Sequence, residues 1–227
     1  MLHMPRIPEL AQRDRFVRRA VSEGRVLTLA DEEHASVSSQ KIPGRTVQLF
    51  WSSSIEARRW AEALAGDSAL QNIPLKSFAA EILPGLGAAK GLAGPDWVSD
   101  PIEAEIDPAD LLLRLKAESL GPYLAELATR GDVFVVTGEN GPWLEPGAVR
   151  GSPAPRLSIF TTSADAERHR QSCGGRTVTA DPLSDFRAST LPWAISRACV
   201  VALEPIPGAG VLDVKSVDLA ERLAKLG

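Results

Sequence analysis

Residues 74–84 read PLKSFAAEILP, and residues 182–192 read PLSDFRASTLP. Six of these eleven positions are identical at an offset of 108 residues. Further matches follow in the same order, at offsets within one residue of this value: 24–26 with 131–133, 51–54 with 160–163, and 110–115 with 218–223. Chance could supply one such match, but not several in one order, so the sequence predicts a tandem duplication of a small domain.

The duplication divides the chain into two expected domains, residues 1–118 and residues 119–227. A chain of 227 residues has room for two small domains, because domains cluster near ~100–150 residues. Short apolar runs alternate with helical patterns in both halves, so we expect an α+β fold with a mixed or antiparallel sheet flanked by helices in each copy. The join at residues 119–122 is too short for a flexible tether, so the copies are expected to pack on each other.

Residue types predict the elements of the first copy. Strands are expected at residues 26–29, 47–51, near 92 and at 102–106. Ser53 and Glu56 have the spacing of a capping box, which would open a helix. A short helix around Phe78 is expected to end at Pro84, because proline cannot continue it. Asp107 is expected to cap the last helix of this copy, whose first residue would be a proline.

The second copy repeats this order. Helices are expected at residues 123–128, after Thr162 and Asp165, and from about 217, and strands at 133–136, 157–160 and 199–203. The loops at residues 30–46 and 138–156 lack a periodic pattern, and their sequences differ although the flanking elements align. Loops of this length are uncommon in compact domains unless they have a function or are disordered.

Composition limits the function classes. A net charge of −4 argues against nucleic-acid binding, which needs a concentrated basic surface. No apolar run approaches the ~20 residues of a membrane span, and the N-terminal stretch has no apolar signal core, so a cytoplasmic location is expected. Cys173 and Cys199 form no metal-binding spacing and are expected to be free thiols. No metal or organic cofactor is expected.

Most of residues 13–117 resemble the bacterial domain of unknown function 2750. The residues that carry this resemblance are Phe16-Val17, Val26–Leu29, Leu49-Phe50-Trp51-Ser52, Ala57, Trp60-Ala61, Pro74-Leu75, Phe78, Leu83-Pro84-Gly85-Leu86 and Asp110-Leu111. In the second copy, residues 159–162 and 164–167 are more similar to the N-terminal domain of the secretion-linked enhanced-serine-sensitivity family, SseB. Both resemblances imply a fold, and neither implies a catalytic residue.

The sequence offers few candidates for catalysis. The glycine-rich stretch 85–91 follows a helix and precedes a strand, which is the wrong context for a phosphate-binding loop. His3 lies near the terminus, and His34 lies in an acidic stretch that is more simply a solvated turn than a metal site. His169 and Cys173 align with inward-facing positions of the first copy, so burial is favoured over a nucleophile–base pair, for which no acid is evident.

Tryptophan provides the candidate binding residues, because it is a large amphipathic side chain that is frequent at interfaces. The candidates are Trp51, Trp97, Trp143 and Leu144. We expect the loop at residues 138–156 to contact another protein or a second subunit through Trp143. The alternative is that tryptophans, Trp143 among them, cover the seam between the two copies.

These observations favour a non-enzymatic protein-binding or adaptor protein, whose partner is another protein or a second copy of itself. One alternative is an immunity-type protein that neutralises a toxin, since an acidic protein captures a basic enzyme quickly. The other is a small hydrolase or transferase, whose polar residues converge only in the fold. The sequence predicts no catalytic residue, no membrane binding and no nucleic-acid partner.

Overall fold

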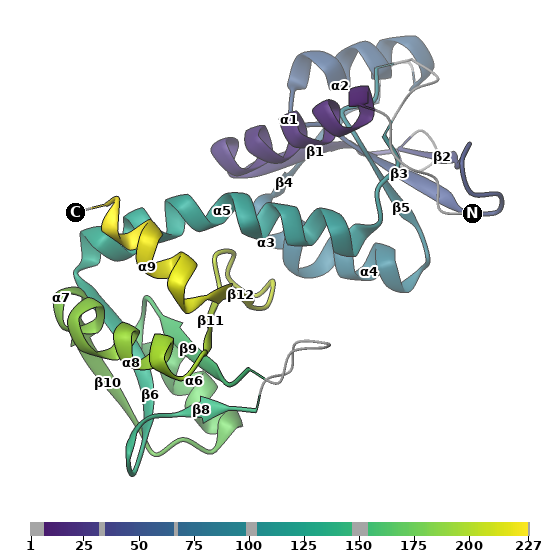
Figure 1. Cartoon of the computed structure of the whole chain (residues 1–227). Helices are drawn as coiled ribbons and strands as arrows, with labels where there is room; N and C mark the ends of the chain where they lie inside the picture. The colour runs from purple at the N-terminus through teal and green to yellow at the C-terminus, as the bar shows by residue number, and fades with distance from the viewer. Residues whose placement is uncertain (1–6, 32–34, 66–67, 99–103, 147–153, 227) are drawn as a thin grey trace. The chain divides into compact units, whose positions relative to one another are not determined.

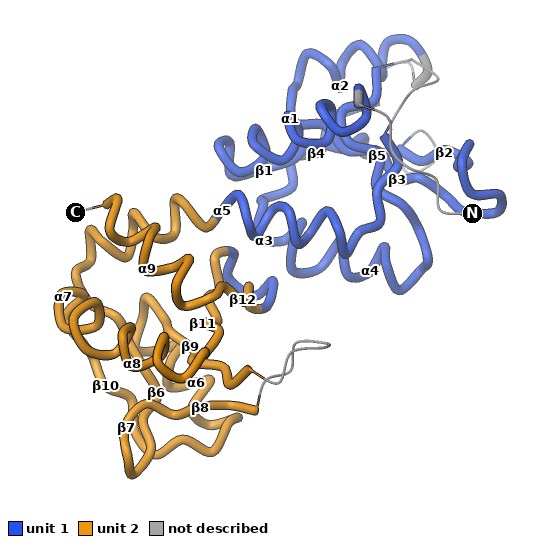
Figure 2. Tube along the Cα trace, viewed as in Figure 1, with its two compact units in different colours: residues 1–119, 206–210 blue, residues 120–205, 211–227 orange. Residues whose placement is uncertain are grey.

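The computed structural model describes residues 7–31, 35–65, 68–98, 104–146 and 154–226. The chain forms two compact units (Figure 2): unit 1 comprises residues 1–119 and 206–210, and unit 2 comprises residues 120–205 and 211–227. Both units combine helices with parallel and antiparallel strand pairs, which confirms the expected α+β class.

The first segment of unit 1 runs from one long helix into the middle of another. Its elements, whose helices α1–α5 and strands are labelled in Figure 1, are α1 (Ile7–Glu23), β1 (Arg25–Leu29), β2 (Ser36–Ser38), β3 (Thr46–Phe50), α2 (Ser54–Trp60), the π-helical turn η1 (Ala61–Ala65), β4 (Leu70–Pro74), α3 (Leu75–Ser77), the π-helical turn η2 (Phe78–Ile82), α4 (Leu83–Ala88), β5 (Leu92–Pro95) and the first half of α5 (Pro108–Arg130). Strand β3 pairs antiparallel with β2 and parallel with β5, and β1 pairs antiparallel with β4. A bridge between Leu27 and Trp51 joins β1 to the end of β3.

The strands of unit 1 bury apolar side chains on both faces. Neighbouring residues of a strand point to opposite faces, so Phe50 and Trp51 enter different clusters. Phe50 lies with Phe16 of α1 and Phe78 of η2, and the Phe50 and Phe78 ring centres are 4.7 Å apart. On the other face Trp51 packs near Trp60 of α2, at 6.1 Å between ring centres. Burial on both faces explains why apolar residues are neighbours in sequence at Val26-Leu27 of β1 and at Leu49-Phe50 of β3.

Unit 2 starts in the second half of α5. Its further elements are β6 (Asp132–Gly138), β7 (Gly141–Pro142), β8 (Leu144–Glu145), β9 (Arg156–Phe160), α6 (Ser163–Cys173), β10 (Thr177–Pro182), α7 (Leu183–Asp185), the π-helical turn η3 (Phe186–Thr190), α8 (Leu191–Ser196), β11 (Val200–Leu203), β12 (Leu212–Lys215) and α9 (Ser216–Ala224). Strand β9 pairs parallel with β11 and antiparallel with β6 and β8, and β10 pairs with the other edge of β6.

The two loops expected to be irregular contain short strands. Strand β2 lies within residues 30–46, and β7 and β8 lie within residues 138–156. Each of these strands pairs with the edge of a longer neighbour, β2 with β3, β7 with β6 and β8 with β9. Two or three residues are too few to show a periodic pattern in sequence, so these strands escaped prediction.

Pro84 does not end its helix, contrary to our expectation. The helix continues from α3 through η2 into α4, and Pro84 occupies the first turn of α4. The π-helical turn η2 ends at Ile82, two residues before Pro84, and includes Ala80, whose carbonyl a proline ring at this position would contact in a regular α-helix. The same arrangement recurs in unit 2, where η3 precedes Pro192.

The join expected at residues 119–122 lies inside a helix, because α5 runs without interruption through Pro122. An internal proline costs about 3 kcal/mol of helix stability. Leu120 before the proline and Leu124 and Leu127 after it lie at helical spacing and are buried in unit 2, which holds the second half of the helix in place. Although α5 is 23 residues long, neither it nor any other helix of the described ranges is apolar enough to cross a membrane.

Candidate functional site

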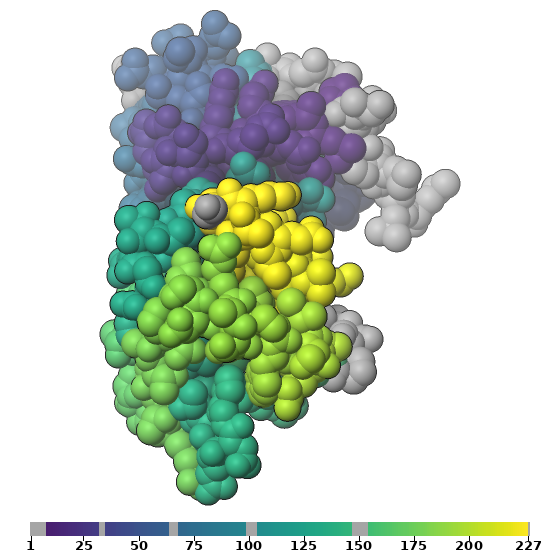
Figure 3. Space-filling view, turned by 60° about the vertical axis from the view of Figure 1, so that its left-hand side comes forward, coloured from purple at the N-terminus to yellow at the C-terminus, as the bar shows by residue number. Residues whose placement is uncertain are grey.

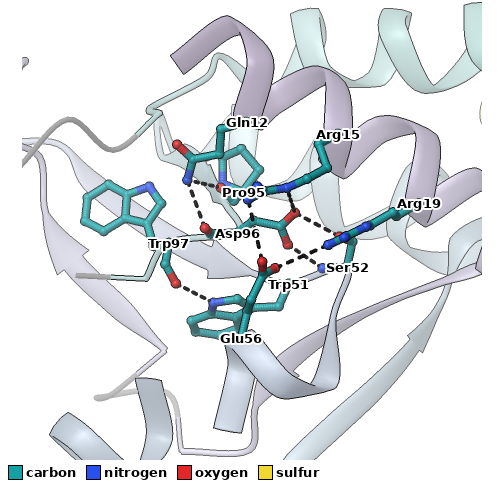
Figure 4. Close-up of polar contacts among 9 residues, drawn as sticks. All are labelled: Gln12, Arg15, Arg19, Trp51, Ser52, Glu56, Pro95, Asp96 and Trp97. Atoms are coloured by element: carbon teal, nitrogen blue, oxygen red, sulfur yellow. Dashed lines mark hydrogen bonds and ion pairs between the residues drawn. The ribbon is translucent and has the colours of Figure 1, made fainter. Parts of the chain in front are cut away.

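In unit 1 the parallel strands β3 and β5 end side by side, and polar residues follow both. Phe50 pairs with Pro95 at the end of the ladder, and the next residues are Trp51-Ser52 and Asp96-Trp97. Ligand sites of sheets with parallel strands lie beyond the carboxyl ends of those strands. A ligand site in unit 1 is therefore expected at this position, and Figure 4 shows its residues.

Asp96 is the centre of this group, and its side chain has no exposed surface. Its Oδ1 accepts a hydrogen bond from the Ser52 backbone N–H at 2.6 Å, and its Oδ2 accepts one from the Ser52 hydroxyl at 2.8 Å. The Asp96 N–H donates to the Phe50 carbonyl at 2.7 Å, and its carbonyl accepts from the Gln12 side chain at 2.9 Å. Asp96 thus connects β3, β5 and α1.

The backbone and the ionisation of Asp96 are both unusual. Its φ of 52° lies in the left-handed region, which aspartate tolerates better than most residues. Burial raises the pKa of the Asp96 carboxyl, the donors of Ser52 lower it, the charge of Glu56 raises it and the charge of Arg15 lowers it. Burial is the largest of these effects, so Asp96 holds its proton to a higher pH than an exposed aspartate.

Two arginines of α1 reach toward α2 beside Asp96 (Figure 4). Arg15 lies 3.8 Å from the Asp96 Oδ2 and 3.7 Å from the Glu56 Oε1, and Arg19 lies 3.6 Å from the Glu56 Oε2. These separations are longer than hydrogen bonds. The Arg15 Nε and the Glu56 Oε2 are buried without a hydrogen-bond partner in the described part of the chain.

The expected capping box at α2 is not formed. Ser53 does precede the helix as its N-cap residue, but its side chain makes no capping hydrogen bond. Glu56 instead lies within ion-pair distance of the α1 arginines. The spacing of Ser53 and Glu56 was suitable, but two cations from another element attract the carboxylate away from the helix end.

Trp51 and Trp97, two of the expected binding residues, are buried within unit 1. The Trp51 indole donates to the Trp97 carbonyl at 2.7 Å, and the Trp97 indole donates to the Ala104 carbonyl at 2.8 Å. Both polar atoms are therefore satisfied inside the unit, and the aromatic surfaces face its core. The structure does not favour a partner contact through either side chain, and their binding role stays a prediction.

An open groove with a volume of about 630 Å³ lies in unit 1. Strands β1, β3 and β4 supply one side of the lining, and η2 and α4 supply the other. Hydrogen-bonding side chains such as Gln48 and Gln71 share the lining with apolar ones such as Ile73, Ile82 and Leu86. Among the lining residues only Glu81 carries a charge.

A second groove, of about 450 Å³, lies in unit 2 between α5 and α9. Figure 3 shows the outer face of α9 in yellow. Asp218, Glu221 and Arg222 of α9 and Lys225 directly after it line this groove, so charges of both signs are close together. Mixed charge of this kind selects no particular charge in a partner.

Trp143 and Leu144 are half-buried within unit 2. Trp143 packs against the cluster of Val136, Phe160 and Ala166, and its backbone N–H donates to the Val136 carbonyl at 2.8 Å. Leu144 packs against the main core of the unit. Both side chains thus have contacts in their own unit while keeping part of their surface exposed, and their binding role stays a prediction.

His169 has an acidic neighbour that the sequence did not reveal. The Glu145 Oε1 lies 2.7 Å from the His169 Nε2 and accepts a hydrogen bond from the Ser158 hydroxyl at 2.8 Å. The serine contacts the carboxylate and not the imidazole, so these three residues lack the serine–histidine–acid order of a hydrolase triad. Glu145 and His169 are far apart in sequence, and no local pattern links them.

The remaining candidates add no site. Cys173 is half-buried and Cys199 is buried, and both are free thiols. No group of three or more histidine, cysteine or acidic side chains in the described ranges is placed to hold a metal ion. His3 and His34 lie outside the described residues.

Comparison with known proteins gives one family match. No curated protein matches the chain. Among solved structures, the chain is similar to Anabaena Tic22, described as a protein of protein transport, at 10% identity and a TM-score of 0.26, over 86% of this chain and 93% of that one. It is also similar to Tic22 from Plasmodium falciparum, at 11% identity and a TM-score of 0.25, over 75% of this chain and 84% of that one. Residues 13–115 match the family described as "Protein of unknown function (DUF2750)", which confirms the resemblance seen in the first half of the sequence.

Proposed function

We propose that the protein is a non-enzymatic protein-binding or adaptor protein, and that the groove of unit 1 takes a segment of its partner. The observation that carries this proposal is the chemistry of the groove lining. Apolar and hydrogen-bonding side chains share the lining of an open channel, and Glu81 supplies the lining's charge. Peptide sites combine apolar contacts for affinity with a few polar groups for orientation.

The buried polar groups of the two units support binding over catalysis. Asp96, whose side chain is fully buried, has both carboxylate oxygens engaged by Ser52. Such a carboxylate positions backbone segments and presents no free oxygen to a substrate. In unit 2, Ser158 is buried and bonded to Glu145, so its hydroxyl is not poised for attack.

Two neighbouring residues of β4 test the groove. Gln71 and Asn72 are both exposed, but strand residues alternate, and of the two only Gln71 lines the groove. Gln71→Trp would fill the groove, whereas Asn72→Trp adds the same bulk on the opposite face. Affinity capture from the native host, read by mass spectrometry, should lose its specific partner with Gln71→Trp and retain it with Asn72→Trp. Equal capture by all three proteins would refute the groove as the binding site.

The proposal includes a tandem duplication, with domains at residues 1–118 and 119–227. Strand register supports it, because pairs in unit 2 repeat those of unit 1 at the offsets found in the sequence. Val26 pairs with Ile73 as Val133 pairs with Asp181, Leu27 with Trp51 as Phe134 with Phe160, Val47 with Leu92 as Arg156 with Val200, and Ala93 with Ile106 as Val201 with Val214. The π-helical turns η2 and η3 also correspond at an offset of 108 residues.

Superposition of the two halves tests the duplication. Residues 13–117 should superpose on residues 120–226 with the same strand order and the same register. Halves that cannot be overlaid would contradict the duplication and leave the groove proposal untouched. The similarity of the second half to the N-terminal domain of the SseB family belongs to this part of the proposal.

A further inference from the structure

The exposed sides of α1 and α2 carry a concentration of arginine. Arg15, Arg18 and Arg19 lie at helical spacing on α1, and Arg59 lies one turn after Glu56 on α2. We call these four residues the arginine surface. The whole chain has a net charge of −4, so a cationic surface in unit 1 is a local feature and does not follow from composition.

The guanidinium groups of this surface make few close ion pairs. Arg18 and Arg59 are exposed and have no ion pair in the part of the chain that the structure describes. Arg19 is 48% exposed, and its contact with Glu56 is 3.6 Å long. Arg13, by contrast, is closely paired with Asp14 at 2.8 Å through two of its nitrogens. The arginine surface therefore retains donors for another acceptor.

Glu56 indicates which acceptor fits. Its two carboxylate oxygens lie 3.7 Å from Arg15 and 3.6 Å from Arg19, so a carboxylate already sits between these guanidinium groups (Figure 4). It sits loosely, because Glu56 starts from α2 and its oxygens do not reach hydrogen-bond distance. A carboxylate that approaches from solvent is free to adopt the paired geometry that arginine prefers.

An apolar side chain adjoins the cations. Ile55 is 65% exposed and lies one turn before Arg59 on α2. A nucleic acid or an anionic membrane would be attracted by charge alone, and either requires a broader basic surface than four arginines beside Glu56. A segment that carries both carboxylates and an aliphatic side chain fits this combination.

We propose that the arginine surface, with Ile55, binds an acidic segment with an aliphatic residue in a partner protein, and that Glu56 competes with that segment for Arg15 and Arg19. The inference rests on the proposed protein-binding function and names the chemistry of the partner. The groove and the arginine surface are then two contacts for one partner.

The direct test is the binding of a fluorescent peptide in which glutamates surround a leucine, measured by anisotropy at low and at moderate salt. Arg19→Glu should weaken binding roughly fivefold to tenfold, because it reverses one exposed charge of the surface. Arg187→Glu is the matched control, since Arg187 is exposed in unit 2 and the net charge changes equally. Glu56→Gln should tighten binding, because it removes the internal competitor. Binding should weaken as salt rises.

Equal effects of Arg19→Glu and Arg187→Glu would overturn the proposal, and so would unchanged or weaker binding by Glu56→Gln. Single-stranded RNA or vesicles with anionic lipid that bind more tightly than the peptide, and depend on Arg19, would also overturn it. Arg18→Ala serves as a second variant, which removes a charge without placing a carboxylate beside Glu56. Gln71→Trp should leave peptide binding unchanged. Partner capture with Gln71→Trp therefore tests the groove, and peptide binding with Arg19→Glu tests the arginine surface independently.

Discussion

Asp96 connects three segments of unit 1, and substitutions there should separate its two roles, as a hydrogen-bond acceptor and as a buried charge. Asp96→Ala removes the acceptor of the Ser52 N–H, which costs about 1–3 kcal/mol when that group stays buried. Alanine also tolerates a φ of 52° less well than aspartate, at a cost of about 1–2 kcal/mol. Removal of a buried carboxylate offsets part of this loss. We expect Asp96→Ala to lower the free energy of unfolding by about 2 kcal/mol at pH 7.

Asp96→Asn should behave differently. Its side-chain carbonyl still accepts from the Ser52 N–H, its amide can donate to the Ser52 hydroxyl, and asparagine tolerates positive φ. We expect a free energy of unfolding within about 1 kcal/mol of the parent protein at pH 7.

The pH dependence checks the charge. The pKa of Asp96 is raised in the folded state, so the folded protein binds the proton more tightly than the unfolded chain. Stability contributed by this proton is present at low pH and is lost as pH rises from the usual aspartate pKa of 3.8 through the raised value. Asp96→Asn removes this loss, so its stability relative to the parent should improve as pH rises. Urea unfolding over a pH series measures both variants. A parent–variant difference that does not change with pH, or an Asp96→Ala protein as stable as the parent, would refute this reasoning.

Three further predictions concern other parts of the molecule. Ile206 is buried in the core of unit 1 although it lies late in the sequence, so Ile206→Ala should cost about 2–4 kcal/mol in thermal or urea unfolding, while Pro207→Ala at the exposed neighbour should cost little. Trp143→Ala should cost about 1–3 kcal/mol because Trp143 is half-buried, and loss of self-association or partner binding with unchanged melting would instead support the contact role expected from the sequence. Burial raises the pKa of the Cys199 thiol, so iodoacetamide should alkylate Cys173 first in the native protein, and thiol titration after denaturation without reductant should find both; faster labelling of Cys199 would contradict its burial.

The sequence predicted the elements that bury apolar residues. Val26–Leu29 and Leu157–Phe160 became strands because their side chains enter the cores of the two units. Strand β4, with the sequence Leu-Gln-Asn-Ile-Pro, was missed. Most of its residues are at least partly exposed, and it forms the outer strand of its pair, so its composition resembles that of a loop.

Proline misled the prediction of helix ends for a local reason. Pro84 and Pro192 each follow a π-helical turn, and Pro122 precedes a stripe of buried leucines. A prediction from the proline alone takes no account of the π-helical turn before it. It also takes no account of the tertiary contacts that stabilise the helical turn after it. Asp107 was predicted correctly because capping is local: its Oδ1 accepts from the Ala109 N–H at 2.9 Å.

The candidate site could not be assembled from sequence, because its residues come from separate elements. Asp96, Ser52 and Arg15 meet only when β3 and β5 pair in parallel and α1 packs beside their ends. Tryptophan was a natural candidate for binding, but in unit 1 the indoles of Trp51 and Trp97 bond inside the core. Arg19 of α1 is exposed, and the sequence alone could not place it and Arg15 beside Glu56 of α2.

Comparison of the two units gives a reason to assign the arginines to recognition and not to folding. At the offset of 107 residues that aligns Gly24 with Gly131, the buried residues Phe16, Val17 and Ala20 of unit 1 correspond to Tyr123, Leu124 and Leu127 of unit 2, which are also buried. The same offset places Pro122, Ala125 and Glu126 where unit 1 has Arg15, Arg18 and Arg19. The acid that aligns with Glu56 is Asp165, which bonds to Thr162 at its own helix start and to Arg168. Under the proposed duplication, both units share one fold, and the buried apolar stripe stabilises it in each. Unit 2 forms this fold without the arginines. Their presence in unit 1 therefore points to a contact outside the fold.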